Sequence, residues 1–197
     1  MEKTHDRGMR QMRSIDRAFT LRSDEESQDL FIEGYFAVFN SPYVLWEGAE
    51  EVILPGAFAD CLGQDVRALI NHDSTLVLGR TIAGTLTLRE NEIGLWGSIR
   101  INRRDADAMN LHARVERGDV NQCSFGFDIR EETFEDLGGG RVRWNIAKVD
   151  PLYEVSICTF PAYEATSVSA RERDYQEIKR RQLETRKAGL MKRLKGE

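Results

Sequence analysis

Short apolar runs separated by turn-forming residues recur between about 30 and 170 and predict a body made mainly of strands. The run 30–39 is the clearest, because aromatic and β-branched residues fill it. The predicted strands are 30–39, 52–54, 66–71, 81–88, 94–101, 120–130, 141–149, 152–159 and 167–170. Seven or more strands with one or two flanking helices predict a mainly β (α+β) fold, a mostly antiparallel body closed like a β-barrel.

Helical patterns occupy two places in the body. The stronger one covers about 104–116 and ends at Gly118, a residue suited to closing a helix. Its apolar face is predicted to carry Ala108, Leu111, His112 and Val115. A shorter helix is predicted over 57–62, with Gly63 as its stop.

The two ends of the chain differ in composition from the body. Residues 1–28 mix charges without an apolar period and predict a flexible leader before a domain at 29–170. Residues 171–197 predict a charged helical tail with ten Lys/Arg and five Asp/Glu, a net charge of +5. Because the whole chain has a net charge of −5, residues 1–170 carry a net charge of −10. Such an acidic body argues against direct binding of nucleic acid, which requires a basic face.

The bulk composition excludes several classes of protein. With 197 residues, of which 41% are hydrophobic, the chain can bury one medium core. It has no apolar run of about eighteen residues and no secretory signal, which predicts no membrane span and a soluble intracellular protein. The three cysteines are isolated in sequence, so we expect them to be reduced thiols. The cysteines and histidines do not have the spacing of zinc ligands, and we expect neither a metal nor another cofactor.

A serine on the predicted strand 120–130 is the first candidate for chemistry. Alternation along a strand turns Gln122, Ser124 and Gly126 to one face, and Cys123, Phe125 and Phe127 to the core. The face of Ser124 is polar and lightly built, with room at Gly126 for a substrate backbone. From these residues alone, a nucleophile and an ordinary solvent-facing serine both remain open.

A serine nucleophile needs a general base and a group that orients that base. His72 follows an apolar strand, at a position where a cleft can open, and histidine suits proton transfer near neutral pH. Glu154 lies in a strand that otherwise suits burial, where a carboxylate requires a partner. Asp150, before Pro151, is the alternative acid, whereas Asp73 adjoins His72 and faces away from it.

Other residues compete for these roles. His112 shares its helix face with apolar residues, which favours a packed side chain over a base, and His5 lies in the leader. Cys123 is an alternative nucleophile, but strand alternation turns it away from Ser124 and no neighbour favours its thiolate.

With these residues, the chain resembles the prohead (capsid-maturation) proteases of tailed bacteriophages, which are related to herpesvirus assemblin. The matching motifs cover about residues 30–170 in family order, and they are 34–40, 55–58, 71–73, 78–80, 123–127, 152–156 and 161–162. The resemblance implies a herpesvirus-protease-like fold, with Ser124 as nucleophile and His72 as general base. The herpesvirus branch has a second histidine as third member. This chain has no histidine after His112, so an acid must take that role, and Glu154 fits.

The resemblance also implies a biological role. It predicts a serine endopeptidase that digests the phage scaffold, or the scaffold-like part of the major capsid protein, inside the immature capsid in the host cytoplasm. Self-cleavage is expected, and a homo-oligomer is a further option. The alternatives are a non-catalytic assembly protein that retains the barrel and a cysteine protease using Cys123. The herpesvirus arginine pair that stabilises the oxyanion has no match in 159–165.

Overall fold

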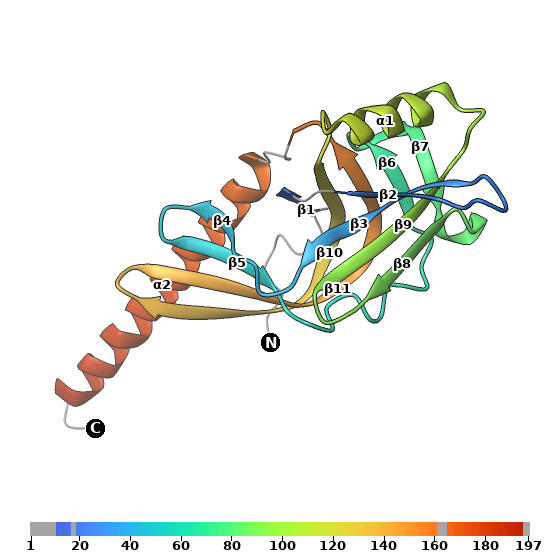
Figure 1. The fold of residues 1–197 in the computed structure, drawn as a ribbon. Coiled ribbons are helices and arrows are strands. Elements are labelled where there is room, and N and C mark those ends of the chain that lie inside the picture. Colours follow the sequence, from blue (N-terminus) through green and yellow to red (C-terminus); the bar gives the residue numbers. More distant parts are fainter. Residues whose placement is uncertain (1–10, 17–18, 161–164, 195–197) are drawn as a thin grey trace. The chain divides into compact units, whose positions relative to one another are not determined.

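The computed structural model describes residues 11–16, 19–160 and 165–194 (Figure 1). The chain divides into two compact units, a body formed by residues 7–163 and a second unit that contains the tail, 164–197. The described strands all belong to the body. They are β1 (Gln11–Asp16), β2 (Thr20–Ser23), β3 (Leu30–Val38), β4 (Tyr43–Trp46), β5 (Ala49–Ile53), β6 (Arg67–Ile70), β7 (Asp73–Arg80), β8 (Leu86–Glu90), β9 (Gly94–Ile101), β10 (Gln122–Gly138) and β11 (Arg141–Cys158).

The strands form two sheets. The larger sheet has the order β1-β10-β11-β5-β4, and β6 joins it by pairing with β11 and β7. The smaller sheet has the order β2-β3-β9-β8. The core cluster contains side chains from both sheets, such as Ile32 and Ile99 of the smaller one and Phe125 and Ile157 of the larger one. The hydrophobic core therefore lies between the sheets.

The mainly β fold with helices is confirmed, but the prediction of a closed antiparallel barrel is wrong. Among the described residues the two sheets stay separate, and β11 pairs in parallel with both β5 and β6. The 18-residue β11 allows this arrangement because β10 covers one of its edges while β5 and β6 share the other. A strand of that length can therefore join several partners without closing the sheet on itself.

Some predicted elements differ from the observed ones. Residues 57–62 form a series of turns instead of a helix, because their backbone bonds join residues three apart and the Glu90 carboxylate accepts from the Gly56 and Phe58 N–H groups. The predicted strand at 167–170 lies inside helix α2. The leader predicted at 1–28 contains β1 and β2.

Helix α1 (Ala106–Arg117) lies across one end of the body (Figure 1), and its ends follow local rules. The Asp105 side chain accepts hydrogen bonds from the backbone N–H groups of Asp107 and Ala108, as an N-cap does. Gly118 has a φ of 81° and closes the helix through bonds to the last-turn carbonyls. The sequence therefore specifies this helix almost completely.

Helix α2 (Ala165–Leu194) belongs to the second unit and is described by itself. It starts a few residues before the predicted tail at 171. Glu177 and Arg181 form an ion pair one turn apart at 2.7 Å, whereas Leu183 and Leu190 are exposed. Such a mixed, mostly charged surface is that of a solvated helix. None of the helices in the described segments has the length and apolarity required to span a membrane.

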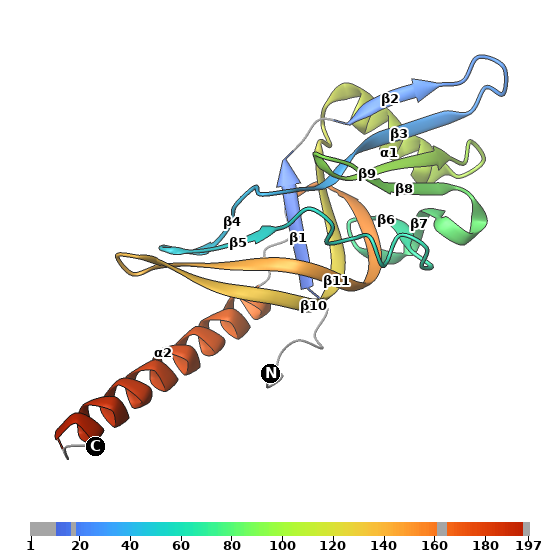
Figure 2. The same ribbon diagram turned by 90° about the horizontal axis from the view of Figure 1, so that it is seen from below.

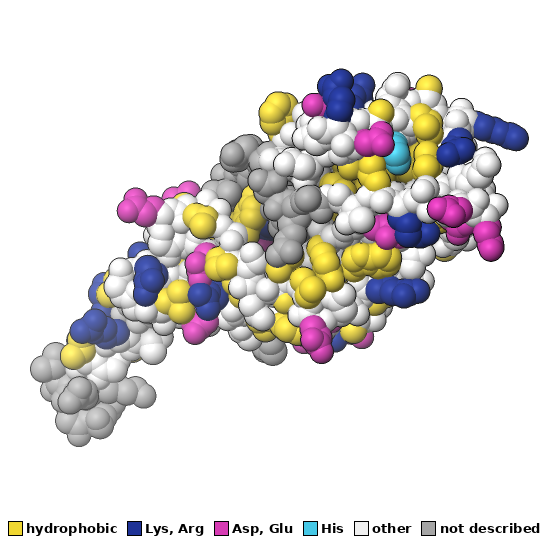
Figure 3. All heavy atoms as spheres, in the orientation of Figure 1, with side chains coloured by type: hydrophobic (Ala, Val, Ile, Leu, Met, Phe, Trp, Pro, Cys, Tyr) yellow, Lys and Arg dark blue, Asp and Glu magenta, His cyan; other side chains and the backbone are white. Residues whose placement is uncertain are grey.

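Charge on the body is mixed. On the face shown in Figure 3, acidic and basic side chains lie interspersed, without a continuous basic patch among the residues drawn there.

Candidate active site

His72 is presented by a tight turn. Ile70 of β6 pairs with Asp73 of β7, so Asn71 and His72 form a two-residue hairpin loop. Both have positive φ, 50° and 61°, as the central residues of a type I′ turn do. Asparagine tolerates this conformation, but histidine adopts it rarely. Strained backbone of this kind is concentrated at functional sites.

The neighbouring strand holds this turn in place. The Asn71 N–H donates to the Ile157 carbonyl at 3.0 Å, which extends the parallel pairing of β6 with β11. The Asn71 side-chain oxygen accepts from the Thr159 N–H at 2.9 Å. The His72 N–H donates to the Ser156 hydroxyl at 3.3 Å. The turn that carries the histidine is therefore tied to β11 at several points.

The His72 side chain meets a buried carboxylate. Its Nδ1 lies 2.7 Å from Glu154 Oε1, and Glu154 is only 2% exposed. An ionised carboxylate can only accept, so Nδ1 is the donor in this bond, and in the neutral imidazole Nε2 then presents a lone pair. The Ser156 hydroxyl donates to the other oxygen of Glu154 at 2.5 Å. Both carboxylate oxygens are thereby bonded and the imidazole is fixed in one tautomer.

Ser124 lies on the same face of the strand pair. In the antiparallel pairing of β10 with β11, Ser124 is opposite Ser156 and Gly126 is opposite Glu154. Directly opposed residues share a face and have Cα atoms about 4.5–5.5 Å apart. Ser124 is completely buried, which differs from the solvent-facing alternative, and its hydroxyl has no hydrogen-bond partner. The structure thus brings Ser124 beside the Glu154–His72 pair without a bond between Ser124 and His72.

The Nε2 atom of His72 contacts a different residue. Cys158 Sγ lies 3.7 Å from it, within reach of a weak S–H···N hydrogen bond. Burial, together with the negative charge of Glu154, raises the pKa of the Cys158 thiol to about 12. Cys158 is therefore a protonated donor that occupies the lone pair of His72.

The other two candidate acids have different partners. Asp150 accepts from the Gln64 side-chain amide at 2.7 Å and pairs with Arg130 at 3.1 Å. Asp73 accepts from the backbone N–H and hydroxyl of Thr75. The geometry therefore favours Glu154 over both as the partner of His72.

The remaining candidates lie elsewhere. His112 is buried on the inner face of α1, as its apolar neighbours predict. Cys123 is buried, and its thiol donates to the Tyr35 carbonyl at 3.1 Å on the core side of β10. His5 lies outside the described residues.

Two residues of this cluster were not singled out from the sequence. Ser156 and Cys158 follow Glu154 at intervals of two, so strand alternation puts all three on one face. That signal was present in the sequence. Their contacts with His72 were not, because they depend on the pairing of β6 with β11.

Arg80, a residue of the 78–80 motif, lies at the end of the β6–β7 hairpin away from the Asn71–His72 turn. Arg80 donates to the Asp65 carboxylate at 2.7 and 2.5 Å, and this contact lowers the pKa of that carboxyl below its usual value. Arg80 pairs with Arg67 across β6 and β7. Its position therefore favours a structural role over stabilisation of an oxyanion.

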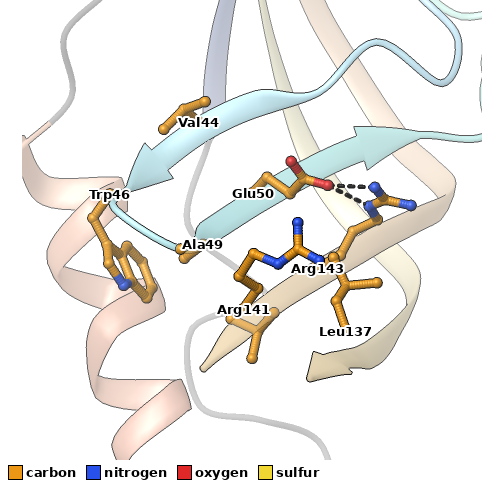
Figure 4. A pocket seen from close by; sticks show the side chains of 9 residues that line it. Val44, Trp46, Ala49, Glu50, Leu137, Arg141 and Arg143 are labelled. Atoms are coloured by element: carbon orange, nitrogen blue, oxygen red, sulfur yellow. Dashed lines mark hydrogen bonds and ion pairs between the residues drawn. The ribbon is translucent and has the colours of Figure 1, made fainter. Parts of the chain in front are cut away.

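Two surface hollows are lined by residues other than the catalytic candidates. One, of about 260 Å³, lies between the β4–β5 and β10–β11 hairpins and includes the ion pair of Glu50 with Arg143 at 2.6 Å (Figure 4). A wider one, of about 530 Å³, extends from the end of α1 to Thr159, the residue that bonds Asn71. In the described part of the chain, no group of three His, Cys, Asp or Glu side chains is placed to hold a metal ion.

Comparison with known proteins identifies the class. The chain belongs to the caudovirus prohead serine protease family, whose sequence model matches residues 17–181. The matched range contains His72, Ser124 and Glu154, and the predicted family is confirmed.

One relative with a curated description agrees with this assignment. The chain is 32% identical over 142 residues to the prohead protease of Enterobacteria phage HK97, which covers 70% of this chain and 58% of that protein. The chain therefore spans less than two thirds of the length of this relative. Among solved structures, it is similar to the bacteriophage T4 capsid assembly protease, gp21, with a TM-score of 0.47 and 12% identity over 76% of this chain and 96% of that chain.

Proposed function

We propose that this protein is a serine endopeptidase that processes the phage scaffold, or the scaffold-like part of the major capsid protein, inside the prohead. We include its own chain among the substrates. The observation that carries the proposal is the bond from His72 to the buried carboxylate of Glu154, on the strand face that also holds Ser124. Membership of the prohead serine protease family supports the same reaction.

The proposed mechanism assigns one role to each residue. The Ser124 hydroxyl attacks the carbonyl carbon of the peptide bond, and His72 Nε2 takes the hydroxyl proton. The imidazolium then gives that proton to the leaving amine, and water hydrolyses the resulting acyl-enzyme. Glu154 keeps Nδ1 protonated, orients the ring and stabilises its positive charge.

The reaction requires one adjustment of the site. His72 Nε2 must leave the thiol of Cys158 and reach the hydroxyl of Ser124, while Nδ1 keeps its bond to Glu154. Catalytic hydrogen bonds are often long or misaligned before substrate binds and tighten in the complex. We infer that binding of a substrate strand drives this change.

One observation favours a second chemistry. Cys158, His72 and Glu154 form a contiguous chain, which resembles a thiol nucleophile with its base and orienting acid. A nucleophilic cysteine requires a lowered pKa, however, whereas burial raises the pKa of this thiol to about 12. The serine mechanism is therefore the stronger proposal.

The motif order supports a common origin with herpesvirus assemblin, in which Glu154 of this chain takes the place of a second histidine. The alternative of a non-catalytic assembly protein gives no reason for a buried carboxylate bonded to a strained histidine. The common origin with assemblin and the catalytic role of Glu154 are both parts of the proposal.

Co-expression with the phage capsid and scaffold proteins, followed by mass spectrometry of every chain, tests the function. Wild type is expected to cut its substrates and itself, and Ser124→Ala to cut neither. Ser98→Ala is the matched control, because Ser98 is also a nearly buried strand serine but bonds Glu33 at 2.8 Å. Cleavage by Ser124→Ala at the wild-type rate contradicts the serine mechanism, and absence of cleavage by wild type favours the assembly protein.

A further inference from the structure

Strand β1 covers the edge of the strand that carries Ser124. It lies antiparallel beside β10 (Figure 2). The pairing runs from Gln11 opposite Phe127 to Asp16 opposite Gln122, and Ser14 lies opposite Ser124. In the sheet order, β1 is terminal and β10 is next to it. Without β1, the backbone of β10 would therefore present an open edge at the candidate nucleophile.

A buried ion pair fastens β1 to the body. The Arg13 guanidinium donates to both carboxylate oxygens of Glu51 on β5, at 2.5 and 3.0 Å. Arg13 is 3% exposed and Glu51 is 1% exposed. A two-point contact of this kind matches the planar fork of arginine and not the single ammonium of lysine.

The surroundings of this ion pair have the character of a side-chain pocket. The Arg13 guanidinium lies 5.2 Å from the centre of the Tyr43 ring and 5.7 Å from that of Phe127, within the range of cation–π contacts. A small cavity of about 60 Å³ remains beside it, lined in part by Val38 and Pro42. An acidic group at the base and aromatic walls make a site selective for arginine.

The segment that fills this pocket precedes the part of the chain that matches the family. The family match begins at residue 17, whereas β1 ends at Asp16. Glu51 and the edge of β10 lie within the residues that match the family model, whereas β1, which occupies the pocket, lies outside them. Extended peptides commonly bind proteins by adding a strand to an open sheet edge, with pockets that select particular side chains.

We propose that the edge of β10 and the Glu51 pocket together form the binding site for an extended substrate peptide with an arginine, and that β1 occupies this site in cis. The proposal rests on the proposed peptidase function. A substrate strand in the register of β1 places its arginine in the pocket and the next residue opposite Ser124. Glu51 is then the residue that determines specificity, and the chain is latent while β1 is bound.

The first test measures occupancy of the edge without catalysis. In the full-length Ser124→Ala protein, hydrogen–deuterium exchange of residues 122–127 is followed by mass spectrometry. Arg13→Ala is expected to speed exchange there by roughly tenfold or more, since a lost charge pair frees the strand. Arg22→Ala is the matched control, because Arg22 of β2 bonds Glu33 at 3.0 Å away from β10. Equal exchange in all three proteins makes β1 a permanent edge strand and overturns the proposal.

The second test measures the arginine pocket. A synthetic peptide with the sequence of residues 10–17 is titrated into the same Ser124→Ala proteins by fluorescence anisotropy. The protein carrying Arg13→Ala is expected to bind it roughly tenfold more tightly than the parent protein, and a peptide with alanine in place of its central arginine to bind weakly. Adding Glu51→Gln is expected to remove the preference between the peptides. An unchanged preference after Glu51→Gln overturns the assignment of the pocket.

Two further variants guard against misfolding. Arg13→Ala leaves the buried charge of Glu51 without its partner. If this unfolds the protein, the double variant Arg13→Ala/Glu51→Gln removes that charge and replaces Arg13→Ala in the exchange experiment. The pair Arg13→Met with Glu51→Leu replaces the ion pair by apolar contact, which buried sites often tolerate. It is expected to keep β1 bound, with slow exchange and no arginine selectivity. Rapid exchange in this pair would contradict retention of β1 by apolar contact and leave the ion pair of Arg13 with Glu51 as its anchor.

Measurements of peptide cleavage distinguish failure of this inference from failure of the proposed peptidase function. With Ser124 restored, Arg13→Ala is expected to cleave arginine-containing peptides faster than wild type. Cleavage that depends on Ser124 but is equally fast in wild type and Arg13→Ala overturns the latency alone. Peptide binding and exchange as expected, with no cleavage by either protein, contradict the peptidase function and leave a peptide-binding site.

Discussion

Glu154 Oε1 accepts a hydrogen bond from His72 Nδ1 at 2.7 Å, although the two residues lie 82 positions apart in the chain. The histidine stands on a strained two-residue turn and the carboxylate lies inside a long strand. Because Ser156 bonds the second oxygen of Glu154, the carboxylate has little freedom to turn away. The imidazole is thereby held with Nε2 beside the Cys158 thiol.

Replacement of Glu154 by glutamine is expected to slow turnover by roughly 10²- to 10⁴-fold, since the amide favours the wrong tautomer and leaves the imidazolium without a counter-charge. Asp150→Asn is the matched control, because Asp150 bonds Gln64 and Arg130 instead. Initial rates of substrate cleavage, with circular dichroism to verify folding, measure the effect. Loss of activity in Asp150→Asn alone would transfer the orienting role to Asp150.

Cys158 is expected to restrain His72 and not to attack the substrate. Cys158→Ala frees Nε2 from its thiol contact, so the cleavage rate should equal or exceed that of wild type. Cys158→Ser should cleave more slowly than Cys158→Ala, because a hydroxyl is a stronger donor to the imidazole. Complete loss of cleavage in a folded Cys158→Ala protein, with activity retained in Ser124→Ala, would establish the thiol as the nucleophile.

The turn at Asn71 provides a test of local stability. Asn71→Val should lower the free energy of unfolding by about 1–2 kcal/mol more than Asn71→Gly, because a β-branched residue resists positive φ and glycine does not. Both substitutions remove the bonds to Thr159, so their difference isolates the backbone term. Urea unfolding measures it, and equal stability of the two variants contradicts the strained turn.

Two buried thiols predict a pH dependence of stability. Burial raises the pKa of both Cys61 and Cys158 to about 12, from an ordinary value of 9.0, so each holds its proton more tightly in the folded protein. Their stabilising contribution is complete below about pH 9 and is lost as the pH rises towards 12, because the unfolded thiols ionise first. Urea unfolding midpoints should fall over this range.

The matched comparison for this effect is the Cys61→Ala/Cys158→Ala protein. Lysines and tyrosines titrate in both proteins, so the difference between them isolates the thiols. The fall in midpoint with pH should be smaller in the double variant. An identical fall in both proteins would show that the thiols are not buried as described.

Local patterns predicted much of the fold. The aromatic run of β3 and the apolar face and end of α1 agree with the predicted ranges, because propensity, capping and burial all favour the same element there. Strands β1 and β2 were missed because charged and polar residues fill them, and pairing with β10 and β3 stabilises them instead. The closed barrel was wrong because the order of strands in a sheet depends on partners far apart in the chain.

The sequence by itself determined the family, through its ordered motifs, and the face on which each strand residue lies. Alternation with a period of two separates Ser124 from Cys123 and groups Glu154, Ser156 and Cys158, since it depends only on neighbouring residues. Only the tertiary structure decided which side chains meet across strands. The parallel pairing of β6 with β11 brings His72 to Glu154 and Cys158, and β1 brings Arg13 to Glu51. Those contacts depend on strand order and register, which no local pattern specifies.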